Sequence, residues 1–305
     1  MYEADDPRSR LSTATKAPPA APTNAGFSSA VYARFYDSPP QEETPTGRTW
    51  LARGQNFIVA YSDAKAGAML ERRGQPDEYV LLLPDEGAGA TIVANGERQQ
   101  VPGYTITMIP PGDSSIELAE DGRAIRLFSS QSADLAAACS NADDYREPHP
   151  HIPPFQPWPE PVGGYRIRSY SLDVPEEPGR FGKIWRCTTF MVNVFPPAIG
   201  PRDTAKLSPH HHDDFEQCSL AIGGAYLHHL RWPWTPDQAD WREDEHELCG
   251  SPSICVIPPR VIHTSAAVDP GTNLLVDIFS PPRTDFSKMP GWVLNADEYP
   301  APPEA

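Results

Sequence analysis

Proline is the residue that most restricts what this chain can fold into. The 305-residue sequence contains 37 prolines. Proline is excluded from helix interiors and central strands, because it lacks an N–H donor and its ring fixes φ. Apolar residues come instead in short runs ended by Gly, Pro, Asn or Asp, as in NFIVAYS, EYVLLLP and NLLVDIFSPP. We therefore expect an all-β protein made of many short strands joined by stiff turns.

These runs form two blocks, separated by the proline-rich segment REPHPHIPPFQPWPEPVGG. The Asn-Gly pair at 95–96 predicts a tight type I′ hairpin turn. One short helix is expected over 132–145, with Ser132 as its N-cap. We predict two antiparallel jelly-roll β-barrels in tandem. The predicted regions are an N-terminal arm (1–47), a first barrel (48–140), a linker (141–163) and a second barrel with a C-terminal tail (164–305).

Charge and composition restrict the partners and the compartment. The formal net charge of −16 disfavours binding to nucleic acid or to anionic membranes. No apolar run is long enough to cross a bilayer, and the N-terminus lacks a signal-peptide pattern, so we expect a cytoplasmic protein. The five cysteines include no CxxC pair, which indicates reduced thiols rather than a disulfide framework.

The strongest functional signal is a set of histidines with a nearby carboxylate. His210 and His212 stand two residues apart, so on a strand their side chains would share one face, while His211 would point away. Glu216 follows closely, and His263 lies in the later run CVIPPRVIH. Imidazole and carboxylate groups are suitable ligands for a divalent transition metal. The sequence thus predicts a metal site formed by His210, His212, Glu216 and His263.

These two stretches resemble the motifs of the cupin superfamily. The first cupin motif has the form HxH, three or four residues, Glu, six residues and Gly, and here it reads His210, His212, Glu216 and Gly223. The second has the form PxGxxH, and Pro258 and His263 match it. Arg260 stands where Gly is usual, so the turn before His263 departs from the pattern of the family.

The resemblance implies a metal held inside the second barrel, with coordination positions open to water, substrate or dioxygen. Fe(II) is the ion we favour, with Mn, Ni or Zn as alternatives. In the first block the equivalent positions carry no histidine, so that barrel should bind no metal. This pattern resembles bicupins in which one barrel has lost its site, and cupins commonly form homodimers. The first-block positions are Glu71, Arg73, Glu78, Pro110, Gly112 and Ser115.

Residues that follow the first motif are candidates for proton transfer. Either Tyr226 with His228, or His229 alone, faces the barrel interior, and we favour Tyr226 and His228 as catalytic residues. Arg202 and Lys206 either attract an anionic substrate or are solvated surface. Other segments are open to two interpretations: Cys218 is a buried thiol or a neighbour of the metal, and the tryptophans 232, 234 and 241 form a lid or a dimer contact.

Three functions are compatible with these features. The first is a dioxygenase in which a small oxygen-rich substrate chelates the metal. The second is a metal-dependent isomerase or lyase acting on a sugar acid or a related carbonyl compound. The third is a non-catalytic small-molecule binding protein. We favour the dioxygenase, although one barrel fold supports many reactions.

Overall fold

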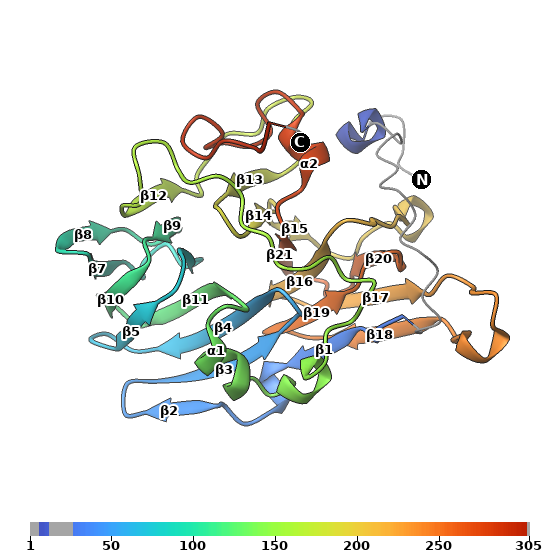
Figure 1. Cartoon of the computed structure of the whole chain (residues 1–305), viewed down its shortest axis with the longest axis horizontal. Helices are drawn as coiled ribbons and strands as arrows, with labels where there is room; N and C mark the ends of the chain where they lie inside the picture. Colours follow the sequence, from blue (N-terminus) through green and yellow to red (C-terminus); the bar gives the residue numbers. More distant parts are fainter. Residues whose placement is uncertain (1–5, 12–26, 304–305) are drawn as a thin grey trace.

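The computed structural model describes residues 6–11 and 27–303 of the chain. Within these residues the only α-helices are the short α1 (Ala133–Ala138) and α2 (Thr284–Ser287). Antiparallel strands make up almost all other regular structure, as Figure 1 shows. The predicted all-β fold of two jelly-roll barrels is therefore confirmed. Isolated 3₁₀ turns complete the inventory: η1 (Pro7–Arg10), η2 (Phe35–Asp37), η3 (Ala142–Tyr145), η4 (Thr204–Lys206) and η5 (Gln238–Asp240).

The first barrel is formed by a seven-stranded sheet and a four-stranded sheet. The large sheet has the order β12-β9-β6-β11-β4-β3-β2, and the small one has the order β5-β10-β7-β8. In chain order the strands are β2 (Glu42–Thr44), β3 (Gly47–Arg53), β4 (Phe57–Ala64), β5 (Met69–Gln75), β6 (Tyr79–Leu83), β7 (Ala90–Ala94), β8 (Glu97–Val101), β9 (Thr105–Ile109), β10 (Gly112–Leu118), β11 (Gly122–Ser129) and β12 (Arg168–Ser171).

The second barrel repeats this plan. Its large sheet has the order β1-β19-β16-β21-β14-β13, with β15 also pairing with β21, and its small sheet has the order β18-β17-β20. In chain order the strands are β1 (Val31–Arg34), β13 (Lys183–Arg186), β14 (Met191–Val194), β15 (Ala198–Ile199), β16 (Glu216–Gly223), β17 (Tyr226–Arg231), β18 (Glu245–Cys249), β19 (Ser253–Ile257), β20 (Ile262–Ala267) and β21 (Thr272–Ser280).

The two large sheets pack face to face and enclose the largest apolar core. This core contains alternate residues of both sheets, such as Val80 and Ile125 from the first and Leu220 and Ile278 from the second. The opposite face of each large sheet lines its own barrel interior. Strands such as β6 are therefore buried on both faces, which explains why the sequence shows unbroken apolar runs rather than alternation.

Three strands cross the predicted region boundaries. β1 and β2 lie in the predicted N-terminal arm, yet β1 pairs with β19 in the second barrel and β2 pairs with β3 in the first. β12 lies beyond the predicted linker, yet it pairs with β9 in the first barrel. Figure 1 shows the blue β1 beside the orange strands of the second barrel. The predicted division at residues 47 and 164 is thus wrong for these strands, because pairing is decided by contacts distant in sequence.

The tightest turn forms where the sequence predicts it. Asn95 and Gly96 both have positive φ, 51° and 81°, and they join β7 to β8 as the predicted type I′ turn. The predicted helix is shorter than expected, since α1 ends at Ala138 and only a 3₁₀ turn follows. Ser132 stands at the N-cap position, but its hydroxyl accepts from the Gln75 amide instead of capping the helix.

Candidate functional site

His210 and His263 are held together by their own backbones. The His210 N–H donates to the His263 carbonyl at 3.1 Å, and the His263 N–H donates to the His210 carbonyl at 2.8 Å. This is an isolated bridge, so the expected strand through His210 and His212 is instead an irregular segment laid along β20. Arg260 adopts φ +69°, the conformation for which the motif normally uses Gly, and its N–H donates to the His212 carbonyl at 2.6 Å.

The three histidine rings converge. Ring centroids lie 4.5 Å apart for His210 and His263, 5.0 Å for His212 and His263, and 6.4 Å for His210 and His212. Each Nδ1 lies 2.8–3.1 Å from a backbone carbonyl oxygen. A carbonyl can only accept, so these contacts favour the proton on Nδ1, which leaves the Nε2 lone pairs of His212 and His263 directed at Gln217 Oε1. His211 is exposed and lies beside Asp213, outside this cluster.

Burial keeps these imidazoles neutral. It lowers the pKa of His263 to about 4, with the Arg283 guanidinium adding to the effect. Burial also lowers the pKa of His210 and of His212 well below the usual imidazole value, and the neighbouring His263 acts in the same direction. Neutral imidazoles are the form that binds metals.

Glu216, predicted as the carboxylate ligand, points away from the histidines. Its two carboxylate oxygens accept the backbone N–H groups of Gln55 and Asn56 in the first barrel, both at 2.9 Å. Burial raises its pKa to about 7. Glu216 points away because side chains alternate along β16. Those of Glu216 and Cys218 face the core between the barrels, whereas that of Gln217 faces the interior of the second barrel. Cys218 is therefore not beside the histidines either.

Gln217 occupies the place predicted for Glu216. Its Oε1 lies 3.2 Å from His212 Nε2 and 3.3 Å from His263 Nε2. Its amide nitrogen donates to Ser219 Oγ at 3.1 Å, while that hydroxyl donates to Asp277 at 2.7 Å. Because Ser219 gives its proton to Asp277, it must accept from Gln217, and this fixes the amide oxygen toward the histidines. The motif allows three or four residues after HxH, and the four-residue spacing would have identified Gln217.

The donor chemistry of this cluster fits a divalent transition metal. No group of three or more His, Cys, Asp or Glu side chains in residues 6–11 and 27–303 is arranged as a complete metal site. The cluster here adds an amide, however, whose Oε1 lies 3.2 Å from His212 Nε2 and 3.3 Å from His263 Nε2; with the ring protons on Nδ1, the three lone pairs face one another. A cation relieves such a contact, and imidazole nitrogen and amide oxygen are both usual donors.

A cavity of about 390 Å³ opens beside the cluster; it is called the second-barrel cavity below. Its polar wall contains His210, His263 and Gln217, and Asp277 and Tyr226 lie on its other sides. Two cationic side chains, Arg8 and Arg202, also line it, together with the apolar residues Phe195, Pro196, Ala198, Ile199, Pro201, Ala267 and Leu275.

Asp277 is a functional candidate that the sequence analysis missed. It is 8% exposed, accepts from the Ser219 hydroxyl and faces the second-barrel cavity. Burial raises its pKa to about 6. A signal was available, because a single carboxylate interrupts the otherwise apolar strand NLLVDIFS. Acids inside apolar runs are rarely buried without a role or a partner.

Tyr226 and His228 face inward and His229 faces outward, which is the parity we favoured. Tyr226 lines the second-barrel cavity. His228 is not among the described residues that line this cavity. Its Nδ1 lies 2.8 Å from the hydroxyl of Ser265, and Ser265 is one of the lining residues. His228 contacts the cavity lining through Ser265, and its predicted catalytic role stays a prediction. His229 pairs with His246 on the surface.

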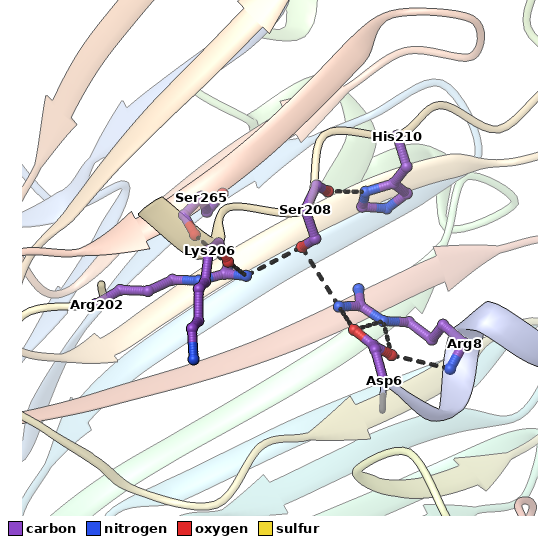
Figure 2. Close-up of polar contacts among 7 residues, drawn as sticks. All are labelled: Asp6, Arg8, Arg202, Lys206, Ser208, His210 and Ser265. Atoms are coloured by element: carbon purple, nitrogen blue, oxygen red, sulfur yellow. Dashed lines mark hydrogen bonds and ion pairs between the residues drawn. The ribbon is translucent and has the colours of Figure 1, made fainter. Parts of the chain in front are cut away.

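Arg8 and Arg202 converge on one hydroxyl at the cavity wall. Figure 2 shows Ser208 between the two guanidinium groups, with His210 on the same segment. Ser208 Oγ accepts from Arg202 Nη2 at 3.1 Å and from Arg8 Nη2 at 3.4 Å. Arg8 also forms an ion pair with Asp6 at 2.6 Å. Arg202 donates otherwise to the Ser265 and Lys206 carbonyls, and no described carboxylate lies within ion-pair distance of it.

The remaining predicted candidates lie elsewhere. Lys206 is exposed and does not line the second-barrel cavity. Trp232 is buried, while Trp234 and Trp241 are exposed and stack with centroids 4.3 Å apart, also away from the cavity lining. All five cysteines are buried and unpaired. No helix among the described residues has the length and apolarity to span a membrane.

Comparison with known proteins identifies the fold. No protein-family model matches the chain, and no curated protein matches it in sequence. Among solved structures, AerE from Microcystis aeruginosa matches with a TM-score of 0.53 and 10% identity, over 78% of this chain and 94% of that one. A single-substitution variant of the Bacillus subtilis oxalate decarboxylase matches with a TM-score of 0.52 and 14% identity, over 89% of this chain and 84% of that one.

A third match is the Lactobacillus farciminis oxalate decarboxylase formate complex, with a TM-score of 0.50 and 14% identity, over 85% of this chain and 88% of that one. At such low identity the likeness establishes the fold alone. The chain thus has the cupin fold, in agreement with the resemblance of its motifs.

Proposed function

We propose that the second barrel is the active site of a metal-dependent enzyme that acts on a small carboxylate-bearing substrate, with a dioxygenase as the favoured reaction. The observation that carries this proposal is the convergence of three neutral imidazoles and Gln217 Oε1 beside the second-barrel cavity. We propose Fe(II) as the ion, with Mn, Ni or Zn as alternatives that the same donors accept.

The proposed ligands are His210, His212, His263 and Gln217. All four are uncharged, so the ion would keep its full double positive charge and attract an anionic, chelating substrate. When bound, an Fe(II) ion would supply electron transfer to dioxygen. The protein side of the chemistry is to hold the ligands through their Nδ1 contacts to backbone carbonyls and to exclude water by burial.

Arg202 supports a carboxylate as the substrate group. Its charge lines the cavity without a carboxylate partner among the described residues, and Arg8 adds a second cation nearby. A guanidinium binds a carboxylate through two parallel hydrogen bonds. Two of the structural neighbours are named oxalate decarboxylases, and oxalate is itself a small dicarboxylate.

An isomerase or lyase is the second candidate, and Asp277 and Tyr226 favour it. Both line the second-barrel cavity, where a carboxylate and a phenol could take up and return a proton at a carbon next to a carbonyl. Ser219 orients Asp277 by donating a hydrogen bond to it at 2.7 Å. A non-catalytic binding protein would use the same cavity but would turn over neither class of compound.

Elemental analysis of protein purified without added metal tests the site. We expect about one equivalent of a first-row transition metal in the wild type and a loss of about tenfold or more in His263→Ala. His229→Ala is the matched control, because that histidine lies on the neighbouring strand and faces outward. Equal metal content in His263→Ala and wild type would overturn the proposed ligand set.

Substrate screening separates the reactions. Catechols, diketones, hydroxy-aromatic acids and sugar acids are incubated with the metal-loaded protein, and dioxygen uptake is recorded in parallel with solvent-deuterium incorporation. Uptake of dioxygen supports the dioxygenase; deuterium incorporation without uptake supports the isomerase or lyase. Arg202→Met should raise KM by about tenfold for carboxylate-bearing substrates and leave neutral analogues unaffected. A binding protein would show neither signal.

A further inference from the structure

A second, smaller cavity lies in the first barrel. It has a volume of about 110 Å³ and is called the first-barrel cavity below. It is lined by the β2–β3 hairpin, by the start of β5 and by Arg126 of β11. Arg126 shares its strand face with Ala124 and Phe128, which belong to the core inside the first barrel. The guanidinium therefore points into the barrel, where a polar group needs a partner.

Arg126 is a buried cation without a visible counter-charge. Its side chain is 6% exposed, it makes no hydrogen bond or ion pair to any described residue, and its Nε is buried without a partner. The guanidinium lies near the Phe128 ring, 5.7 Å from the ring centroid. Arginine does not lose its proton in proteins, and burying an unpaired ion is costly. Such a group is expected to hold an anion.

The other cations around this cavity are already paired. Arg72 binds Asp134 at 2.7 Å and also donates to Gln75. Arg48 binds Asp63 at 3.0 Å. Of the lining carboxylates, Glu71 lies 3.8 Å from Arg73 and Glu42 is exposed. Arg126 is thus the charge available to a ligand, and Glu42 is a carboxylate of the cavity lining that could compete.

Two buried hydroxyls complete the cavity wall. Thr49 Oγ1 and Ser62 Oγ lie 2.8 Å apart and both line the cavity. Their mutual hydrogen bond uses one hydroxyl proton, so the other remains for a ligand oxygen. A buried water needs only about 10–15 Å³ of such space, so a cavity of about 110 Å³ has room for a small oxyanion. Formate, acetate, bicarbonate and phosphate are anions of that kind.

We propose that the first barrel, which lacks metal ligands, binds a small oxyanion between the Arg126 guanidinium and the hydroxyls of Thr49 and Ser62. The site is separate from the histidine cluster in the second barrel. It gives the first barrel a ligand of its own, and occupation would stabilise that barrel because only the folded state forms the cavity.

Thermal unfolding of the full-length protein tests this proposal. Sodium formate, acetate and phosphate are titrated separately at constant ionic strength, and the midpoint Tm is recorded, with calorimetric titration for the affinity. We expect at least one of these anions to raise Tm by about 3 °C or more at saturation. Arg202→Met is the matched control: it removes a cation from the other cavity, so it loses any shift that arises there and should keep the shift from the first-barrel cavity. Arg126→Met should lose the part of the shift that Arg202→Met keeps.

Any one of four outcomes would overturn the proposal. The first is no response of the wild type to any of the three anions. The second is an unchanged response in folded Arg126→Met, with folding checked by circular dichroism. The third is a response that appears only in Glu42→Gln, which would show that the chain's own carboxylate occupies the site. A response lost in Arg202→Met but kept in Arg126→Met would place the anion in the second barrel instead.

Discussion

The two barrels share a framework but hold opposite charges at matching positions. β6 and β11 place Leu81 opposite Arg126 in the first barrel, and β16 and β21 place Ser219 opposite Asp277 in the second. Leu81 lies three residues after Glu78, and Ser219 lies three residues after Glu216. Arg126 therefore takes the position of Asp277, and Tyr79 takes that of Gln217.

This difference shows how one β framework yields a filled barrel and an open one. The Tyr79 ring stacks on Phe128 at 4.7 Å and its hydroxyl bonds Ser114, so aromatic rings fill the space that Gln217 and the histidines surround in the second barrel. The pockets described in the first barrel, of about 110 and 190 Å³, are smaller than the second-barrel cavity. The missing histidines predict no metal in the first barrel, and the packing of Tyr79 adds a steric reason.

Each barrel has a buried glutamate at the equivalent position, Glu78 in the first and Glu216 in the second. Glu216 of the second barrel accepts two backbone N–H groups from the first barrel. Glu78 of the first barrel accepts the Thr188 N–H of the second at 2.8 Å and the Tyr299 hydroxyl at 3.1 Å. Each barrel thus extends one carboxylate into the backbone of the other. Their shared task is to join the barrels, and this is why Glu216 is not available as a ligand.

The largest effect should follow from Glu216→Gln. An amide offers one acceptor oxygen where two backbone donors need one each, so a buried N–H loses its partner. We expect a loss of about 3 kcal/mol in the free energy of unfolding, measured by urea denaturation. Glu78→Gln should cost about 1 kcal/mol, because the Tyr299 hydroxyl can turn to accept from the new amide. Metal loss from Glu216→Gln without a change in stability would contradict this assignment.

Gln217→Glu should strengthen metal binding in the second barrel. It adds a carboxylate about where the amide oxygen now lies, close to His212 and His263. Affinity for a divalent metal should rise about tenfold, measured by competition with a chelator. Cys218→Ala is the control, since the neighbouring thiol faces the other side of β16. Weaker binding in Gln217→Glu would argue that the amide is not a ligand.

Arg126→Met should stabilise the first barrel in buffers free of small oxyanions. Replacing an unpaired buried ion by an apolar side chain removes its desolvation cost, and we expect a gain of about 1 kcal/mol in the free energy of unfolding. Arg72→Met should have the opposite sign, because Arg72 loses Asp134 and Gln75 as partners. A destabilised Arg126→Met would mean that the guanidinium is satisfied within the chain.

The smallest effect concerns pH. Burial raises the pKa of Glu78 above its usual value of 4.5. The folded protein therefore binds this proton more tightly than the unfolded chain does, so stability should fall as pH rises from 4.5 through the raised pKa. Urea denaturation across this range should show a slope that Glu78→Gln reduces but does not remove, because burial also raises the pKa of Glu216 to about 7 and that of Asp277 to about 6. An unchanged slope would exclude Glu78 as its source.

Much of the fold could be predicted from local sequence. The apolar runs identified most large-sheet strands, and Asn95 and Gly96 identified a turn, because strands and turns depend on nearby residues. The choice between Glu216 and Gln217 could not be settled in this way. It depends on which alternate side chains of β16 face the second-barrel interior, and the side chains on both faces of this strand are buried.

Long-range placement was the second limit. Arg8 belongs to the predicted N-terminal arm, and only the folded chain brings it to the second-barrel cavity. Asp277 was visible as a charge within an apolar strand, but its partner Ser219 lies on another strand. The histidines were found because the cupin motifs bring distant ligands together in a known order. Arg126 belongs to no motif, and its only local signal is that it interrupts the apolar run AIRLFSS, as Asp277 interrupts NLLVDIFS.

The exchange of β1 and β12 between the barrels limits how this protein can be divided. A fragment that begins at residue 164 would lack the edge strand that pairs with β19, and a fragment that ends at residue 140 would expose the edge of β9. Unpaired edges invite association with other chains. Neither half is therefore a self-sufficient module, and a transplant of the second barrel into another scaffold would have to carry residues 31–34 with it.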